Sequence, residues 1–355
     1  MTAQDHGLRA VSDRVPPRRL TDVESAQAGL HGGRGGRDTV IGLRPPHPLD
    51  RTALPIRLIA RLMIALLVPA PGCAKDSPAG TASAPAASEP AAPEIVQGVR
   101  IAPWKPVFAG IELCQASVVT PRPLRIHAAR IDLTAAGIRL FVTPSNGDLP
   151  GEVNGRQSLK FLSEFKCQLA INASFFAGRF EVGAPMDIVG LSVSNGDVYS
   201  PPNEFAALLI SKDNRARVSA PPFDLAKAYN AAAGDTLLLK DGRIAVDPSL
   251  RNGITVNRHP RSAAGISRDG RYLLLMVIDG RQPGYSEGAT KVETAEWLRK
   301  LGAWEAVNLD GGYSSNLVIE GSGGRPELLN HPGPAFLRPV ANHIGVYARS
   351  LVSKN

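Results

Sequence analysis

The chain has 355 residues, a hydrophobic content of 43% and a formal net charge of +8. This is enough apolar sequence for one large domain or two small ones. Residues 1–73 hold ten Arg, no Lys and six acidic residues, so about half of the excess positive charge lies there. The remainder has no dense stripe of Lys and Arg interleaved with aromatic residues, which argues against nucleic acid as a partner.

The first 73 residues are expected to precede the folded part. Residues 1–53 are rich in Arg, Gly and Pro and lack an apolar period, which predicts disorder. Residues 54–73 have the build of a secretory signal, with Arg57 and Arg61 beside a short apolar run that ends in small residues. The run is too short and too broken for a membrane span. Because such a signal normally stands at the N-terminus, we expect translation to start later than Met1.

A tether and a site of lipidation are predicted next. Cys73 follows Ala-Pro-Gly, which resembles a bacterial lipoprotein signal and implies a possible lipid anchor, although Pro71 departs from the usual pattern. Residues 74–94 form a Pro/Ala/Ser linker with nothing to bury. The folded domain is therefore expected over residues 95–350. We expect an exported protein, either secreted or held in the bacterial cell envelope as a periplasmic or outer-surface lipoprotein.

The folded part alternates short β-branched and apolar runs with turns that contain Gly, Pro, Asn and Asp. Strands are predicted over residues 111–120, 124–133, 138–142, 167–172, 188–193, 198–199, 206–210, 216–219, 236–239, 243–246, 272–278, 304–309, 317–319 and 341–348. Helices are predicted over residues 158–165 and from Thr290 to Leu301, the second opening on a Thr290/Glu293 capping box. The prediction is an α+β fold: a mixed, mostly antiparallel β-sheet core with a few helices, in a single domain.

Two cysteines remain in this part, Cys114 and Cys167. An exported protein could pair them in a disulfide. The alternative is two buried free thiols, because both lie in apolar, strand-like runs.

Two carboxylates stand on glycine turns directly after apolar strands. Asp279 opens Asp-Gly-Arg281, and Asp310 opens Asp-Gly311-Gly312-Tyr-Ser314-Ser315. Paired glycines allow a sharp turn and leave backbone N–H groups near a ligand, while the serines supply hydroxyls. The order strand–loop–helix–strand predicts that both carboxylates emerge at one end of neighbouring strands, where polar sites are commonly built. The alternative is an ordinary hairpin turn.

Other polar residues flank the predicted strands. Asn172 ends one strand, and its amide can bond a sugar hydroxyl or phosphate, or cap the chain end. Arg258, His259 and Arg261 form a basic cluster before another strand. Arginine suits phosphate because its planar fork meets two oxygens, although such clusters are usually solvated loops.

Six motifs in a fixed order resemble the phosphodiester glycosidase domain family. They are Asn-Ala-Ser-Phe-Phe at 172–176, His-Pro-Arg-Ser-Ala-Ala-Gly at 259–265, Val-Ile-Asp-Gly-Arg at 277–281, the helix end Leu301-Gly302, Asn-Leu-Asp-Gly-Gly-Tyr-Ser-Ser at 308–315, and the closing strand near Asn342. The namesake enzyme removes N-acetylglucosamine from a phosphodiester. The resemblance covers roughly residues 100–350. Ala173-Ser174 and Tyr313 stand where the family usually has glycines, which affects the expected shape of the sugar pocket.

The resemblance implies hydrolysis of a sugar-1-phosphodiester in a cell-envelope or extracellular glycan, with an N-acetylglucosamine-1-phosphodiester-like substrate and no cofactor. Asp310 and Asp279 are the candidate catalytic pair, one as base or nucleophile and the other as electrostatic stabiliser. The candidate substrate-binding residues are Arg261, Arg281, Asn172, Gly311, Gly312, Ser314 and Ser315.

Two other functions stay open. One is a non-catalytic envelope polysaccharide-binding protein or an exopolysaccharide-biosynthesis accessory protein. The other is a metal-dependent hydrolase with Asp279, Asp310 and His343 as ligands. No HExxH or paired-His motif supports that second function, and no metal is predicted.

Overall fold

The computed structural model describes residues 94–96, 98–247, 256–333 and 337–351. The predicted signal, the lipidation of Cys73 and nearly all of the linker lie outside these ranges. Within them, no helix is long and apolar enough to cross a membrane. Every strand pairing that the structure describes is antiparallel. The predicted fold class, mostly antiparallel sheet with a few helices, is confirmed.

One sheet of ten strands carries the residues of interest. Its order is β1-β2-β4-β5-β19-β18-β20-β16-β17, and β3 pairs with β4 at its side. The strands are β1 (Glu94–Val96), β2 (Val99–Ile101), β3 (Lys105–Phe108), β4 (Ile111–Val118), β5 (Leu124–Asp132), β16 (Thr236–Lys240), β17 (Arg243–Ile244), β18 (Arg261–Ser267), β19 (Tyr272–Ile278) and β20 (Ala303–Asn308).

Three smaller sheets complete the described fold. One has the order β22-β21-β8-β23-β6, with β6 (Arg139–Val142), β8 (Leu169–Asn172), β21 (Leu317–Glu320), β22 (Pro326–Leu328) and β23 (His343–Tyr347). The second has the order β12-β11-β15-β13-β14, with β11 (Ser192–Ser194), β12 (Asp197–Ser200), β13 (Ala206–Ile210), β14 (Ala216–Ser219) and β15 (Asn230–Gly234). The third has the order β7-β10-β9, with β7 (Val153–Asn154), β9 (Phe176–Gly178) and β10 (Pro185–Ile188).

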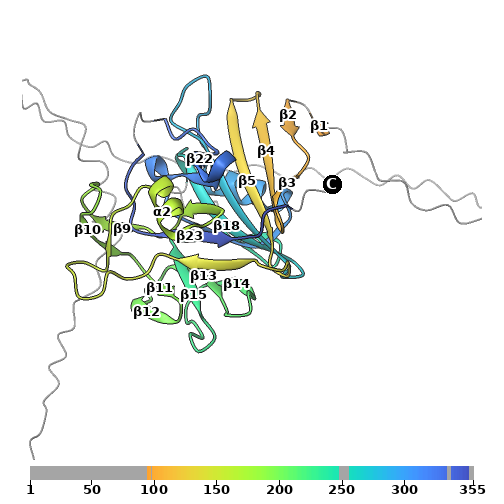
Figure 1. Cartoon of the computed structure of the whole chain (residues 1–355). Coiled ribbons are helices and arrows are strands. Elements are labelled where there is room, and N and C mark those ends of the chain that lie inside the picture. The colour runs from red at the N-terminus through yellow and green to blue at the C-terminus, as the bar shows by residue number, and fades with distance from the viewer. Residues whose placement is uncertain (1–93, 97, 248–255, 334–336, 352–355) are drawn as a thin grey trace, which may run out of the picture. The chain divides into compact units, whose positions relative to one another are not determined.

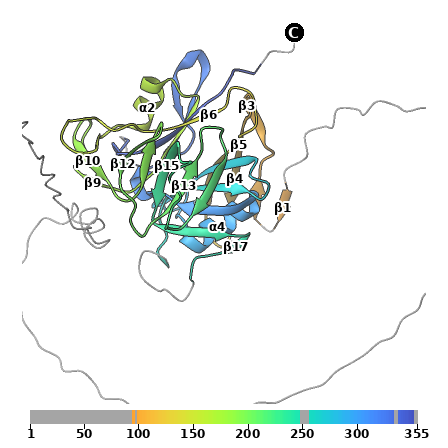
Figure 2. The ribbon, with the colours of Figure 1, turned by 90° about the horizontal axis from the view of Figure 1, so that it is seen from below.

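The sheets stack around a core shared between them. One face of the ten-stranded sheet, with Ile131, Leu275 and Val307, packs against Ile171 of β8 and Leu208 of β13. Helix α4 (Lys291–Lys300) covers the opposite face, and helix α2 (Ser158–Phe165) covers the outer face of the β8 sheet (Figures 1 and 2). This burial on both faces explains why β19 is an unbroken apolar run rather than an alternating one.

Local predictions succeed where the chain carries a strong signal. The predicted helix over residues 158–165 is α2, and the Thr290/Glu293 capping box is present at the start of α4. Cys114 and Cys167 are both buried and free. The strand predicted over residues 188–193 is instead the end of β10 and the start of β11. Gly190, between them, has a φ of +91°, which interrupts an extended strand.

Candidate active site

Three predicted site residues meet at one edge of the ten-stranded sheet. Strand β18 lies between β19 and β20 and runs antiparallel to both. The ends of β19 and β20 and the start of β18 therefore share an edge, and from them come Asp279, Asp310 and Arg261. The expectation that the two carboxylates follow neighbouring strands is thus corrected in one respect: β18 separates them, and its first residue is Arg261.

The turn at Asp310 depends on its two glycines. The amide of Asp310 donates to the Ala173 carbonyl at 2.8 Å, and that of Gly312 donates to the Pro260 carbonyl at 2.9 Å. A Cβ on Gly311 would lie 2.8 Å from the same Pro260 oxygen, and Gly312 has a φ of +63°. Either position would be strained with another residue. The amide of Gly312, predicted to face a ligand, is engaged within the protein.

The Asp310 side chain is buried, with 1% of its surface exposed. Its Oδ2 atom has no hydrogen-bond partner in the described part of the chain. Burial raises the pKa of Asp310 from its ordinary value of 3.8 to about 7, while the neighbouring Ser314 hydroxyl and the Arg338 guanidinium act in the opposite direction. A carboxylate with a free oxygen and a pKa near neutrality can exchange a proton with a bound molecule.

Asn172 holds this turn in place. Its Nδ2 donates to the Asp310 carbonyl at 2.6 Å, and its Oδ1 accepts from Ser262 Oγ at 2.7 Å and from the Asn316 amide at 3.1 Å. The amide was predicted to orient sugar hydroxyls. These contacts tie β8, β18 and the Asp310 turn together, and the role in orienting the sugar stays a prediction.

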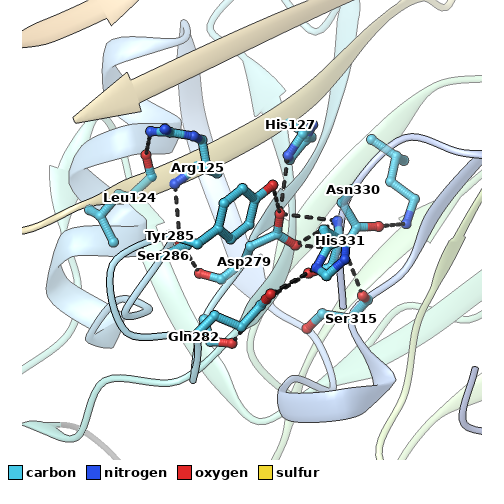
Figure 3. Close-up of polar contacts among 12 residues, drawn as sticks. Leu124, Arg125, His127, Asp279, Gln282, Tyr285, Ser286, Ser315, Asn330 and His331 are labelled. Atoms are coloured by element: carbon cyan, nitrogen blue, oxygen red, sulfur yellow. Dashed lines mark hydrogen bonds and ion pairs between the residues drawn. The ribbon is translucent and has the colours of Figure 1, made fainter. Parts of the chain in front are cut away.

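Asp279 has a different environment, although it is equally buried (Figure 3). Oδ1 accepts from Asn330 Nδ2 at 2.8 Å, and both carboxylate oxygens lie 3.1 Å from the His331 amide. Oδ2 also accepts from Tyr285 at 3.3 Å and lies 3.2 Å from His127 Nε2. The same Asn330 Nδ2 donates to the Ser315 carbonyl at 3.0 Å, so it links the two carboxylate turns.

The two predicted arginines also differ: Arg261 is bonded within the protein, and Arg281 is exposed. Arg261 is buried, and its Nε and one terminal nitrogen donate to the carbonyls of Ala289 (2.8 Å) and Asn257 (2.9 Å). This side chain fixes the loop before α4. Arg281 is exposed and lies over the Tyr313 ring, 4.9 Å from its centroid, next to the Asp310 turn. Arg281 is therefore better placed than Arg261 to meet a ligand phosphate.

Sequence reasoning missed several residues of this site. The Cζ atom of Arg338 lies 5.6 Å from the Tyr313 ring centroid, and the Arg338 charge acts to lower the pKa of Asp310. Asp235 forms a buried ion pair with Lys291 at 2.7 Å and accepts from Asn308 Nδ2 at 2.8 Å. Asn330, which bonds Asp279, and Arg338 each stand close to a proline in a turn-rich stretch, and this composition does not indicate a place near either carboxylate.

His343 does not lie in a metal cluster. Its ring is buried and stacks on Phe161 of α2 at a centroid distance of 4.4 Å. Burial lowers its pKa to about 3, so the ring is neutral. In the part of the chain that the structure describes, no group of three or more His, Cys, Asp or Glu could hold a metal ion.

A separate hollow of about 710 Å³ lies along the β13–β14 turn and residues 224–229. Its lining includes Lys212, Arg217, Asp224 and Tyr229. It contains none of the residues around Asp310. The Asp310 cluster is nevertheless the stronger candidate, because it contains buried polar groups with unmet hydrogen-bonding capacity, which the hollow is not shown to have.

Comparison with known proteins agrees with the motif pattern. Residues 165–347, more than half of the chain, match the family model described as phosphodiester glycosidase. The chain matches no curated protein sequence. Among solved structures, the zebrafish N-acetylglucosamine-1-phosphodiester alpha-N-acetylglucosaminidase catalytic domain, auto-inhibited by its pro-peptide, is 20% identical with a TM-score of 0.51. The match covers 69% of this chain and 85% of that one, and shows a shared fold.

A hypothetical protein from Synechocystis is also similar, at 18% identity and a TM-score of 0.49. That match covers 68% of this chain and 62% of the Synechocystis protein.

Proposed function

Because this chain belongs to the phosphodiester glycosidase family, we propose that it hydrolyses the bond between a sugar's anomeric carbon and a phosphate oxygen. The name of the zebrafish relative supports a substrate of the N-acetylglucosamine-1-phosphodiester kind. The observation that carries the proposal is the Asp310 carboxylate, buried with one unpartnered oxygen in reach of the Arg338 charge.

In the proposed reaction, water attacks the anomeric carbon and Asp310 Oδ2 takes one of its protons. The bond from that carbon to the phosphate oxygen breaks, and its electron pair leaves with the phosphate monoester. Phosphate is a good leaving group, so a strong general acid matters less than for ordinary glycosides. A pKa near 7 suits Asp310 to the role of base close to neutral pH.

The surrounding residues take supporting roles in this proposal. Asp279 fixes the loop at Asn330 and His331, which in turn holds the Ser315 backbone. Its predicted catalytic role stays a prediction, and its contacts favour a positioning role. Ser314 and Ser315 offer hydroxyls to the sugar, and Arg281 offers its guanidinium to the phosphate.

We also propose that the enzyme works outside the cytoplasm, on an envelope or extracellular glycan. The signal-like segment at residues 54–73 and the linker after it support export. Cell fractionation, with mass spectrometry of the mature N-terminus and of Cys73, tests both export and lipidation. A mature protein that begins near Met1 and stays in the cytoplasm would contradict this.

A panel of sugar-1-phosphodiesters tests the reaction itself. Wild type, Asp310→Asn and Asp269→Asn are incubated with each compound, and the products are identified by mass spectrometry. Asp269 is an exposed turn aspartate, so its variant is the matched control. We expect free sugar and a phosphate monoester from wild type and from Asp269→Asn, but not from Asp310→Asn. Saccharide binding without turnover across the whole panel would instead favour the non-catalytic alternative.

A further inference from the structure

Two guanidinium groups lie against one aromatic ring beside Asp310. The Cζ atoms of Arg281 and Arg338 are 4.9 and 5.6 Å from the centroid of Tyr313. Arg338 also contacts Phe180, at 4.2 Å from that ring's centroid. A guanidinium within about 6 Å of a ring centroid is attracted by the ring, so Tyr313 helps to hold both cations. Tyr313 is the third residue after Asp310, which places this pair at the proposed reaction centre.

Arg281 is held in a defined position. It has a φ of +59°, uncommon for a residue with a Cβ, and one of its terminal nitrogens lies 3.2 Å from His259 Nδ1. Burial and the neighbouring arginines lower the pKa of His259 to about 4, so the ring is neutral and can accept this bond. A Cβ built on Gly312 would lie 3.3 Å from the Arg281 guanidinium. The guanidinium therefore lies against the glycine turn.

The charges of this pair have no direct carboxylate partner in the part of the chain that the structure describes. Among the described residues, neither Arg281 nor Arg338 takes part in an ion pair. Burial and the Arg281 charge lower the pKa of Arg338, while Asp310 acts in the other direction. Arg338 is half-buried while Arg281 is exposed, and their like charges repel each other. An anion that contacts both guanidinium groups would relieve this repulsion.

We propose that Arg281 and Arg338, both held against the Tyr313 ring, form the subsite for the phosphate of the substrate. Each planar guanidinium can donate to two phosphate oxygens, so the pair suits a phosphodiester better than a neutral aglycone. Arg338 is then the second phosphate ligand and a determinant of specificity. This assignment rests on the proposed function only in placing the phosphate next to Asp310.

Kinetics with two kinds of substrate test the assignment. Arg338→Gln is compared with wild type on an active sugar-1-phosphodiester and on the 4-nitrophenyl glycoside of the same sugar, which has no phosphate. The phosphodiester KM should rise at least about tenfold, since hydrogen bonds to charged groups are the strong ones. The kcat/KM for the nitrophenyl glycoside should fall by much less, since that substrate loses only the effect of the Arg338 charge on the pKa of Asp310. Equal losses on both substrates, or no loss on either, would overturn the assignment.

Two further variants serve as comparisons. Arg268→Gln removes an exposed arginine that lies over Trp304 at 4.8 Å, away from the Asp310 turn, and should change neither activity. Arg338→Lys keeps the charge but loses the fork, and should weaken phosphodiester binding less than Arg338→Gln. Arg338→Lys also provides a second test of phosphodiester binding if Arg338→Gln is unstable.

A binding measurement separates this assignment from the proposed function. Dimethyl phosphate has no sugar to release, and its binding is followed by titration calorimetry at low salt. Wild type and Arg268→Gln should bind it alike, and Arg281→Gln and Arg338→Gln at least about tenfold more weakly. If wild type binds it in this way but hydrolyses no sugar phosphodiester, the subsite stands and the proposed reaction fails. If hydrolysis occurs but Arg338→Gln binds like wild type, the subsite assignment is wrong and the reaction stands.

Discussion

Asp279 and Asp310 follow the same local pattern, an apolar strand followed by Asp-Gly, yet the fold treats them in opposite ways. Both are 1% exposed. Asp279 is bonded by donors from the 285 and 330 regions, whereas Asp310 keeps an unpartnered Oδ2 in the described structure. Burial with full bonding stabilises a carboxylate, while burial with a free oxygen raises its energy and its affinity for a proton.

This difference separates a carboxylate that supports the structure from one that can react. A carboxylate whose oxygens are all engaged can order loops but has little capacity left for a substrate. One that is desolvated and partly unbonded is destabilised in the resting protein, which is common at functional sites. Substitutions at Asp310 and at Asp279 should therefore have different consequences.

The largest expected effect is on turnover. Asp310→Asn should lower kcat at least about a thousandfold, because a general base lowers the activation barrier by several kcal/mol. The variant should remain folded, since the amide keeps the size of the side chain and removes a desolvated charge. Steady-state rates and far-UV circular dichroism measure the two properties. A folded Asp310→Asn protein with near wild-type kcat would show that Asp310 is not the base.

At the Asp279 turn, the main expected effect is on stability rather than on turnover. Asp279→Ala leaves the donors of Asn330, His331 and Tyr285 without their acceptor, and should reduce the free energy of unfolding by about 3–5 kcal/mol. Urea denaturation monitored by fluorescence measures this. A loss below about 1 kcal/mol would mean that the carboxylate does not hold the loop, and would favour its predicted catalytic role over a positioning role.

The pH dependence of stability distinguishes the two carboxylates further. Burial raises the pKa of Asp310 from 3.8 to about 7, so between these pH values the folded state holds a proton that the unfolded state has lost. The contribution of Asp310 to stability therefore falls as pH rises from about 4 to 7, by on the order of 1.4 kcal/mol per pH unit at most, and is constant above.

Urea denaturation of wild type and Asp310→Asn at pH 5, 6, 7 and 8 measures this contribution. The variant should lack this part of the slope and should be more stable than wild type at pH 8. Asp269→Asn, at an exposed position, is the control and should keep the wild-type slope. Parallel curves for wild type and Asp310→Asn would contradict a raised pKa at this position.

Much of the fold could be predicted because its strands and helix caps carry local signals. The apolar run of β19 and the Thr290/Glu293 box need no distant partner to be read. Strand β15 could not be predicted, because its sequence Asn-Ala-Ala-Ala-Gly has no strand preference. Its last residue, Gly234, is explained by crowding, because a Cβ there would clash with the Asn308 carbonyl oxygen.

The site was predictable in part for the same reason. Two Asp-Gly turns indicate where strands end, and strand order brings them to one edge. Which carboxylate is left unbonded depends on Asn330 and His331, about fifty residues after Asp279 in the sequence. Arg338 comes equally late and meets Tyr313 only in the folded chain. Such partners are set by tertiary packing, which no local pattern records.

The smallest expected effect concerns the hydroxyls beside Asp310. Ser315 Oγ is buried and has no hydrogen-bond partner in the described ranges, whereas Ser262 Oγ donates to Asn172 at 2.7 Å. Ser262→Ala should therefore destabilise the fold by about 1–2 kcal/mol, and Ser315→Ala by less than about 0.5 kcal/mol or not at all. If Ser315 binds the sugar, its alanine variant should raise KM severalfold with stability unchanged. A loss of stability equal to that of Ser262→Ala, with KM unaltered, would show that Ser315 supports the turn rather than the substrate.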